Sequence, residues 1–107
     1  MKRGALVTIA LQGAYGKPRP ALVVQSDLFA THPSVTILPV TSELRETPLF
    51  RVEIKPTAEN GLKHLSQVMI DKIQTVPCEK VGDSFGDVDD KTMLAVNRAL
   101  AVWLGFA

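Results

Sequence analysis

Apolar and polar residues alternate along most of the chain, and this alternation predicts a protein built mainly from β-strands. The clearest run is residues 50–55, where Phe50, Val52 and Ile54 fall on one side and three charged residues fall on the other. A strand of this kind packs one face and exposes the other. Further runs of strand-forming residues, bounded by glycine or proline, predict strands at residues 6–11, 20–25, 35–40 and 66–76.

Within residues 66–76, the apolar side chains change face partway along. Val68 and Ile70 share one parity, Ile73 has the other, and Asp71 lies between them. Because neighbouring strand residues point to opposite faces, a single extra residue would restore a continuous apolar face. We therefore predict a bulge or kink at Asp71, a feature that often redirects side chains near active sites.

A single helix is predicted near the C-terminus. Asp89 is a suitable N-cap, and Gly105 can end the helix. Residues 78–88, which precede it, are expected to be irregular. The apolar residues of the helix form one stripe that we expect to pack against the sheet, made of Met93, Val96, Leu100, Trp103 and Leu104.

Together these elements predict a mainly β (α+β) fold with a single domain over residues 1–107. The architecture expected is a small bent antiparallel sheet, or SH3-like barrel, of about five strands with one C-terminal helix. A chain of this length fits one hydrophobic core, and such a small core favours oligomerisation as a way to bury more surface.

Composition narrows the function mainly by exclusion. Lysine and arginine number 12 and aspartate and glutamate 11, so any contact with nucleic acid must come from a few placed charges. Cys78 is the only cysteine, so an intrachain disulfide is impossible and an oxidising compartment is not required. No run approaches the roughly 18 apolar residues of a membrane-spanning helix. We expect a cytoplasmic protein with no membrane partner.

Neither a metal nor a cofactor is expected. No glycine-rich phosphate loop leads from a strand into a helix, and no His or Cys residues have metal-ligand spacing. His32 lies in a Thr-His-Pro loop and His64 in a turn, and both positions are more typical of surface histidines than of catalysts.

Two short segments carry candidate chemistry. Arg19 stands between Pro18 and Pro20, which stiffen its backbone and present the guanidinium from a loop tip, suited to bidentate contact with a phosphate. Thr41 and Ser42 place two hydroxyl groups at the end of another predicted strand. Either segment alone has a plain structural explanation. Together, an arginine and hydroxyl donors without metal ligands suggest stabilisation of a phosphorane-like transition state.

Taken in order, these segments resemble the MazF/PemK toxins over nearly the whole chain. The likeness comprises Arg3-Gly4, a glycine-containing loop, Lys-Pro-Arg-Pro-Ala-Leu-Val-Val at residues 17–24, Pro-Val-Thr-Ser at 39–42, the alternating strand, and Gln-Val-Met-Ile-Asp-Lys-Ile-Gln-Thr-Val at 67–76. The resemblance implies the toxin of a type II toxin–antitoxin system, a metal-independent, sequence-selective endoribonuclease that cuts single-stranded RNA. It further implies a homodimer and a cognate antitoxin that blocks access of RNA through a partly disordered acidic segment.

The resemblance also assigns roles to individual residues. Arg19 matches an arginine that contacts the scissile phosphate, Thr41 a catalytic threonine, and Asp71 an aspartate that helps to handle the nucleophilic 2′-hydroxyl. The implied reaction is attack of that hydroxyl on the adjacent phosphate, leaving a 2′,3′-cyclic phosphate and a 5′-hydroxyl. Substrate contacts are expected at three further residues, Lys17, Ser42 and Gln67.

Two departures from the family pattern leave the proton carriers open. The first loop, residues 13–16, has no histidine where some members carry one, and Met69 stands where some carry an arginine. Because arginine stays protonated in proteins, Arg19 is better suited to electrostatic stabilisation than to general acid catalysis. The first loop and residues 43–48 would set the RNA sequence recognised.

Two alternatives from other functional classes stay open at this point. The CcdB gyrase poisons are similar in fold, and the chain resembles them at residues 24–27 and in its C-terminal end around Trp103. In that interpretation, however, residues 17–20 and Thr41 have no evident purpose. A non-catalytic SH3-like binding module would explain the fold alone. RNA cleavage is favoured because it accounts for Arg19 and Thr41 together.

Overall fold

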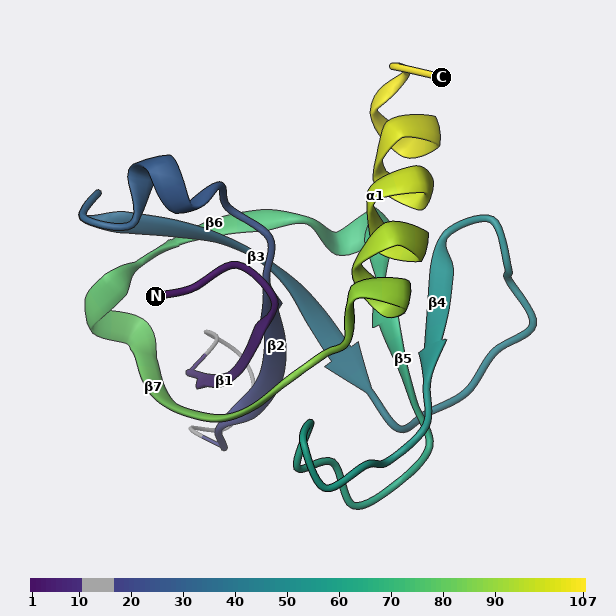
Figure 1. Cartoon of the computed structure of the whole chain (residues 1–107), viewed down its shortest axis with the longest axis horizontal. Coiled ribbons are helices and arrows are strands. Elements are labelled where there is room, and N and C mark those ends of the chain that lie inside the picture. Colours follow the sequence, from purple (N-terminus) through teal and green to yellow (C-terminus); the bar gives the residue numbers. More distant parts are fainter. Residues whose placement is uncertain (11–16) are drawn as a thin grey trace.

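Antiparallel strands form one strongly bent sheet, and a single α-helix follows it (Figure 1). The computed structural model describes residues 1–10 and 17–107, and the predicted first loop at residues 13–16 lies outside them. Within that part of the chain the sheet has 7 strands. They are β1 (Ala5–Ile9), β2 (Arg19–Val23), β3 (Ser34–Thr41), β4 (Arg51–Ile54), β5 (Ser66–Met69), β6 (Gln74–Pro77) and β7 (Val81–Asp87).

The predicted fold class is confirmed, with two corrections to its detail. The strand order is β4-β5-β3-β2-β1-β7, so β4 and β7 are free edges and the sheet does not close into a barrel. The described residues form 7 strands rather than about five, because one predicted strand is divided and another was not foreseen.

The predicted fifth strand, residues 66–76, is the divided one. The short 3-10 turn η2 (Ile70–Lys72) separates β5 from β6, so the predicted kink at Asp71 is confirmed. Ile70 is fully buried, and its backbone N–H donates to the Phe50 carbonyl over 3.0 Å. The kink allows both pieces to pair with the same strand: β3 pairs with β6 near its start and with β5 near its end.

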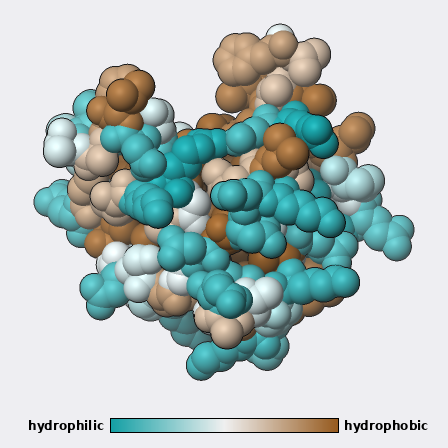
Figure 2. All heavy atoms as spheres, in the orientation of Figure 1, coloured by the Kyte–Doolittle hydropathy of each residue, from teal (hydrophilic) through white to brown (hydrophobic). Residues whose placement is uncertain are grey.

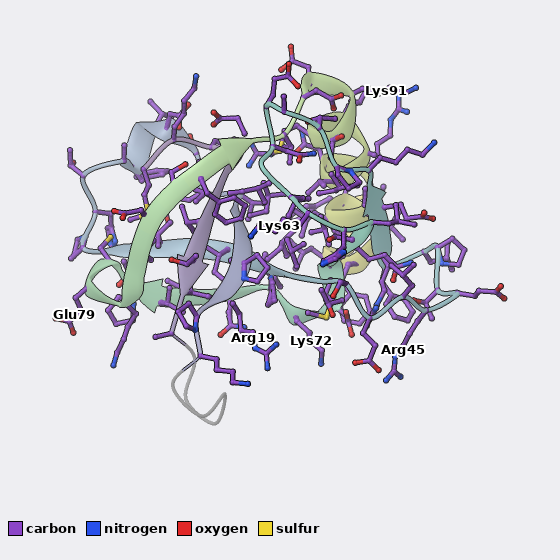
Figure 3. All side chains as sticks on the ribbon, turned by 90° about the horizontal axis from the view of Figure 1, so that it is seen from below. Arg19, Arg45, Lys63, Lys72, Glu79 and Lys91 are labelled. Atoms are coloured by element: carbon purple, nitrogen blue, oxygen red, sulfur yellow. The ribbon has the colours of Figure 1, made fainter. Side chains whose placement is uncertain are left out.

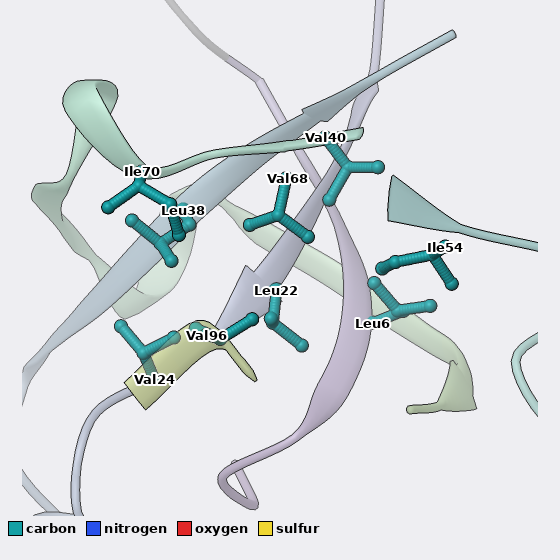
Figure 4. Packing of buried hydrophobic residues seen from close by; sticks show 9 residues of the cluster. All are labelled: Leu6, Leu22, Val24, Leu38, Val40, Ile54, Val68, Ile70 and Val96. Carbon is teal, nitrogen blue, oxygen red and sulfur yellow. The ribbon is translucent and has the colours of Figure 1, made fainter. Parts of the chain in front are cut away.

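The central strands are covered on both faces. Leu6, Leu22 and Leu38 stand in register across β1, β2 and β3 and belong to one core cluster (Figure 4). The sequence neighbours of these leucines point to the opposite face, into a second cluster that includes Val7, Ala21 and Ile37. Because successive strand residues alternate in direction, near-continuous apolar runs in β1, β2 and β3 are what a doubly covered sheet requires.

Strand β7 corrects the expectation that residues 78–88 are irregular. After the 3-10 turn η3 (Cys78–Lys80), residues Val81–Asp87 pair with β1, with two shifts of register. Most of these edge residues are exposed, so they show no apolar alternation. Gly86 lets the strand pass close to the neighbouring turn, since a Cβ there would lie 2.2 Å from the Asn60 carbonyl oxygen.

Helix α1 (Asp90–Leu104) begins and ends as predicted. The Asp89 side chain accepts a hydrogen bond from the Thr92 N–H at 2.7 Å, and bonding to Thr92 lowers the pKa of Asp89. Gly105 ends the helix at a left-handed φ of 85°. The helix is the only α-helix in the described residues, and none of them forms a helix long and apolar enough to span a membrane.

The predicted packing stripe of α1 is correct for its first half only. Val96 is fully buried, and Met93 and Leu100 pack against the same cluster. Trp103 and Leu104 remain 48% and 47% exposed, because the last turns of the helix project beyond the sheet (Figure 1). The Trp103 ring contacts the chain through Phe50, with ring centroids 5.9 Å apart.

The close passage of β7 generates a stability prediction. In Gly86→Ala the new methyl group would collide with backbone rather than with a movable side chain, and the turn it meets is fixed by three hydrogen bonds of the Asn60 side chain. We expect a loss of about 3 kcal/mol in unfolding free energy, the upper part of the range for overpacking.

Gly105→Ala is the matched control. Its Cβ would meet nothing within 4 Å, so only the left-handed backbone penalises it, by about 1–2 kcal/mol. Urea unfolding of both variants measures the difference. If Gly86→Ala is no less stable than Gly105→Ala, the packing of β7 on the Asn60 turn is not as described.

Candidate active site

Thr41 lies at the C-terminal end of β3, where the strand leaves the sheet. It is the register partner of Gln67 on β5 and is partly buried. Its Oγ1 accepts a hydrogen bond from the Glu43 N–H at 3.0 Å. A hydroxyl group has one hydrogen to donate besides its acceptor sites. This contact therefore leaves the Thr41 hydroxyl hydrogen available for a ligand, and Ser42 follows it as an exposed residue.

Gln67 is buried, and its amide group is engaged with the loop that follows Thr41. Its Oε1 accepts from the Arg45 N–H and from Arg51 Nη1, both at 3.0 Å, and its Nε2 donates to the Arg45 carbonyl at 3.0 Å. The sequence predicts Gln67 as a substrate contact. In the structure three hydrogen bonds tie its side chain to the protein itself.

Arg19 is the first residue of β2, and its side chain is exposed. The β2–β3 ladder runs from Val23↔Ile37 to Ala21↔Pro39. Counting two residues further along this register, Arg19 and Thr41 hold corresponding positions at the ends of adjacent strands. The ladder stops short of them where Pro20 and Pro39 lack the N–H that continued pairing requires. The start of β2, with Arg19, and the end of β3, with Thr41, therefore lie next to each other, and we call these two strand ends together one edge.

Asp71 is set apart from this edge. It lies in η2, four residues beyond Gln67, and no hydrogen bond or ion pair joins it to Arg19 or Thr41 within the described part of the chain. The side chain is partly buried, and its Oδ1 has no hydrogen-bond partner among the described residues. A buried oxygen of this kind is costly unless something donates to it.

Positive side chains gather on the side of the molecule that Arg19 occupies. Figure 3 shows Arg19, Lys72 and Arg45 along one side, with Lys91 on the opposite side. Lys17, predicted as a substrate contact, is exposed two residues before Arg19. The row joins β2, η2 and the β3–β4 loop, so it is visible only once the strands are paired. Sequence analysis did not single out Lys72, Arg45 or Arg51.

An open pocket of about 780 Å³ lies between the β3–β4 loop and the sheet, and Gln67, the register partner of Thr41, lines it. Gln67, Arg51 and Glu53 line it from the strands, and the loop contributes Leu44, Arg45, Glu46, Thr47 and Pro48. The pocket is therefore walled by the same loop that Gln67 holds. Elsewhere, no three His, Cys, Asp or Glu residues in the described ranges are grouped so that they could hold a metal ion.

Comparisons with known proteins identify this arrangement. Residues 2–104 match the model of a family described as PemK-like, MazF-like toxin of type II toxin-antitoxin system. The chain is 44% identical to a probable endoribonuclease MazF from Mycolicibacterium smegmatis, over 100% of this chain and 99% of that protein.

Solved structures agree. An endoribonuclease from a mycobacterial species, in complex with its cognate antitoxin, superposes with a TM-score of 0.84 at 27% identity, over 100% of this chain and 97% of that one. The Mycobacterium tuberculosis toxin MazF-mt6 gives 0.81 at 25% identity, over 94% and 96%. These matches confirm the predicted toxin family and its endoribonuclease activity, and they favour RNA over gyrase as the target. The chain belongs to the PemK-like, MazF-like toxin family of type II toxin–antitoxin systems.

Proposed function

We propose that this endoribonuclease toxin cuts single-stranded RNA, in the cytoplasm, at the edge formed by the ends of β2 and β3. The observation that carries the proposal is the register that brings Arg19 and Thr41 to corresponding positions on adjacent strand ends. Lys72 and Arg45 lie on the same side as Arg19 and supply further positive charge for an RNA backbone (Figure 3). Binding is local, as a net charge of +1 requires.

The reaction is an internal transfer at one phosphodiester. The 2′-oxygen forms a bond to the adjacent phosphorus, the bond from phosphorus to the 5′-oxygen breaks, the 2′-hydroxyl loses its proton, and the 5′-oxygen gains one. The products are a 2′,3′-cyclic phosphate and a 5′-hydroxyl. Negative charge grows on the non-bridging oxygens as the transition state forms, so donors fixed in advance around those oxygens lower the barrier.

Arg19 and Thr41 are the donors that we assign to this charge. Arginine remains charged and offers a planar pair of N–H groups that fits two phosphate oxygens. The Thr41 Oγ1 accepts from the Glu43 N–H, so its own hydrogen is left to donate to a third phosphate oxygen. Ser42 and Lys17, both exposed beside these residues, contact the flanking backbone.

Asp71 is the acidic group that we assign to the 2′-hydroxyl. Its Oδ1 is buried without a partner among the described residues, but the residue as a whole is only partly buried, so a hydroxyl donor would approach the accessible part of the carboxylate. Asp71 precedes Lys72 in η2, so an RNA that follows the row marked by Arg19, Lys72 and Arg45 passes this turn (Figure 3). Cleavage on this account uses fixed charges of the protein in place of a divalent metal ion.

The partners that we propose are a second copy of the chain and a cognate antitoxin. Figure 2 shows two apolar projections on one face, over η1 (Asp27–Phe29) and over the end of α1. Their most exposed residues are Leu28, Phe29, Val102 and Phe106. Apolar surface of this extent favours burial against another chain. An acidic antitoxin segment would compete with RNA for the positive row that includes Arg19.

Removal of the Arg19 charge tests the site. Arg19→Ala should lower the RNA cleavage rate about 100-fold or more, as expected for loss of a preorganised charge stabiliser. The melting temperature should stay near that of the unsubstituted protein, since the side chain is exposed at a strand end. Single-turnover cleavage of a defined oligonucleotide measures the rate.

Lys91→Ala is the matched control, because it removes one positive charge from the opposite side of the molecule (Figure 3). It should cleave at the unsubstituted rate. Equal rates for both variants would place the active site away from β2. Growth of a bacterial host that expresses each variant tests the gyrase alternative. If gyrase were the target, Arg19→Ala should stay toxic and deletion of residues 105–107 should abolish toxicity.

Light scattering tests the partners. At micromolar concentration the purified chain should have about twice its monomer mass of 11.6 kDa, because a small domain with exposed apolar projections gains stability by burying them. Addition of the cognate antitoxin should raise the mass further and suppress cleavage. A monodisperse monomer would contradict the proposed homodimer. Full cleavage in saturating antitoxin would contradict the proposed antitoxin partner.

A further inference from the structure

A closed circuit of hydrogen bonds surrounds Thr41. The Glu43 N–H donates to Thr41 Oγ1 at 3.0 Å, and the Glu43 carbonyl accepts from Arg51 Nη1 at 2.9 Å. The same Nη1 donates to Gln67 Oε1 at 3.0 Å, and Gln67 is paired with Thr41 across the β3–β5 ladder. The circuit thus runs from Thr41 through the loop and back through two strands.

Arg51 is the member that closes this circuit. One nitrogen of its guanidinium bridges an oxygen of the loop and an oxygen of β5, while its backbone belongs to β4. Hydrogen bonds from a charged donor are stronger than neutral ones, and the side chain is partly buried, which limits competition from water. Of the other β4 residues, Val52 and Ile54 face the apolar cluster, whereas Glu53 is exposed.

Gln67 fixes the middle of the loop in the same way. It holds both the N–H and the carbonyl of Arg45, so its amide pairs with the loop backbone as a neighbouring strand would. The remaining side-chain contact of Arg45 is an ion pair with Glu43 at 3.3 Å, exposed on both sides. Exposed pairs of this kind contribute little. Two backbone bonds also hold the loop, from the Thr47 N–H to the Arg45 carbonyl at 3.1 Å and from the Phe50 N–H to the Thr47 carbonyl at 3.2 Å. Gln67 and Arg51 are the side chains that tie the loop to the neighbouring strands.

We propose that Arg51 and Gln67 are positioning residues that hold Thr41 and the β3–β4 loop in one arrangement, and that they thereby determine which RNA sequence is cut. The inference rests on the proposed function and deepens it. The loop they hold walls the open pocket of about 780 Å³, which Gln67 and Arg51 also line. A pocket at this place receives an unpaired base next to the scissile phosphate, and its walls decide which base fits.

The pocket chemistry supports recognition of a base edge. Glu53 presents a carboxylate, which accepts hydrogen bonds from exocyclic amino groups, and backbone groups of the loop complete the wall. Displacement of the loop by about 1 Å would misplace both the base and Thr41, an error that can change rates about 100-fold. Specificity and rate are thus coupled through two residues that touch neither the phosphate nor the attacking hydroxyl.

Paired variants of Arg51 test the proposal. Arg51→Met keeps an unbranched side chain but removes the donor, whereas Arg51→Lys keeps an ammonium that can donate to both oxygens. RNA of mixed sequence is cut, the new 5′ ends are sequenced, and kcat/KM is measured for the preferred site and for its single-base variants. In Arg51→Met the ratio between preferred and disfavoured sites should fall at least about tenfold. Arg51→Lys should restore most of it.

This ratio separates positioning from a merely structural role. A variant that only reduces the amount of folded enzyme lowers cleavage at every site by the same factor and leaves the ratio unchanged. An unchanged ratio in folded Arg51→Met would overturn the proposal. Absence of RNA cleavage by the unsubstituted protein would instead overturn the proposed function on which it rests.

A second pair of variants changes the loop and leaves the buried residues of the strands intact. Arg45→Pro removes the N–H that Gln67 accepts, and Arg45→Ala removes the same side chain but keeps that N–H. Residue 45 is exposed, so both variants should fold. Arg45→Pro should show the loss of discrimination seen in Arg51→Met, and Arg45→Ala should retain more of it. Equal discrimination in the two would contradict the role of Gln67.

Discussion

The structure depends on β3, which pairs with β2 along one edge and with both β5 and β6 along the other. One regular strand at residues 66–76 could not make both sets of pairs with β3, because the register of β5 against β3 differs from that of β6. The kink at Ile70–Lys72 divides that strand, keeps both halves paired, and leaves Asp71 in a turn with one buried oxygen free of partners among the described residues. The same constraint brings the end of β3, with Thr41, beside the start of β2, with Arg19.

Hydrogen bonds of the Gln67 side chain then fix the loop that follows Thr41. Burial of a glutamine amide costs stability unless its hydrogen-bonding groups are satisfied, and Gln67 meets that condition by pairing with the Arg45 backbone and with Arg51. The same hydrogen bonds order the loop that follows Thr41. The proposed mechanism needs this order, because it relies on donors that are already in place.

The sequence predicts those features that local patterns encode. Alternation locates most strands, the change of parity at Ile73 locates the kink, and Asp89 and Gly105 mark the helix ends. It does not predict β7, because an exposed edge strand with glycines that admit close packing lacks an apolar pattern. It also overestimates burial of Trp103, since the length of the helix relative to the sheet is a tertiary property.

The candidate site likewise contains residues that the sequence indicates and residues that only the structure indicates. Arg19 and Thr41 stand out because prolines and a strand end flank them. Arg51 does not stand out, because in sequence it is one of several charges on the polar face of an alternating strand. Only the pairing of β4 with β5 brings it to Gln67. Residues that act through another residue are recognised from contacts rather than from motifs.

The most direct test of the account is cleavage of two matched RNA oligonucleotides in excess EDTA. One is wholly ribonucleotide, and the other carries a single 2′-deoxy sugar immediately before the scissile phosphate. We expect the first to be cut, with a 5′-hydroxyl on the downstream product, and the second to stay intact at that bond, because its nucleophile is missing. Cleavage of the 2′-deoxy substrate at the same bond, or activity that vanishes in EDTA and returns with one divalent ion, would contradict attack by the 2′-hydroxyl at a site of fixed protein charges.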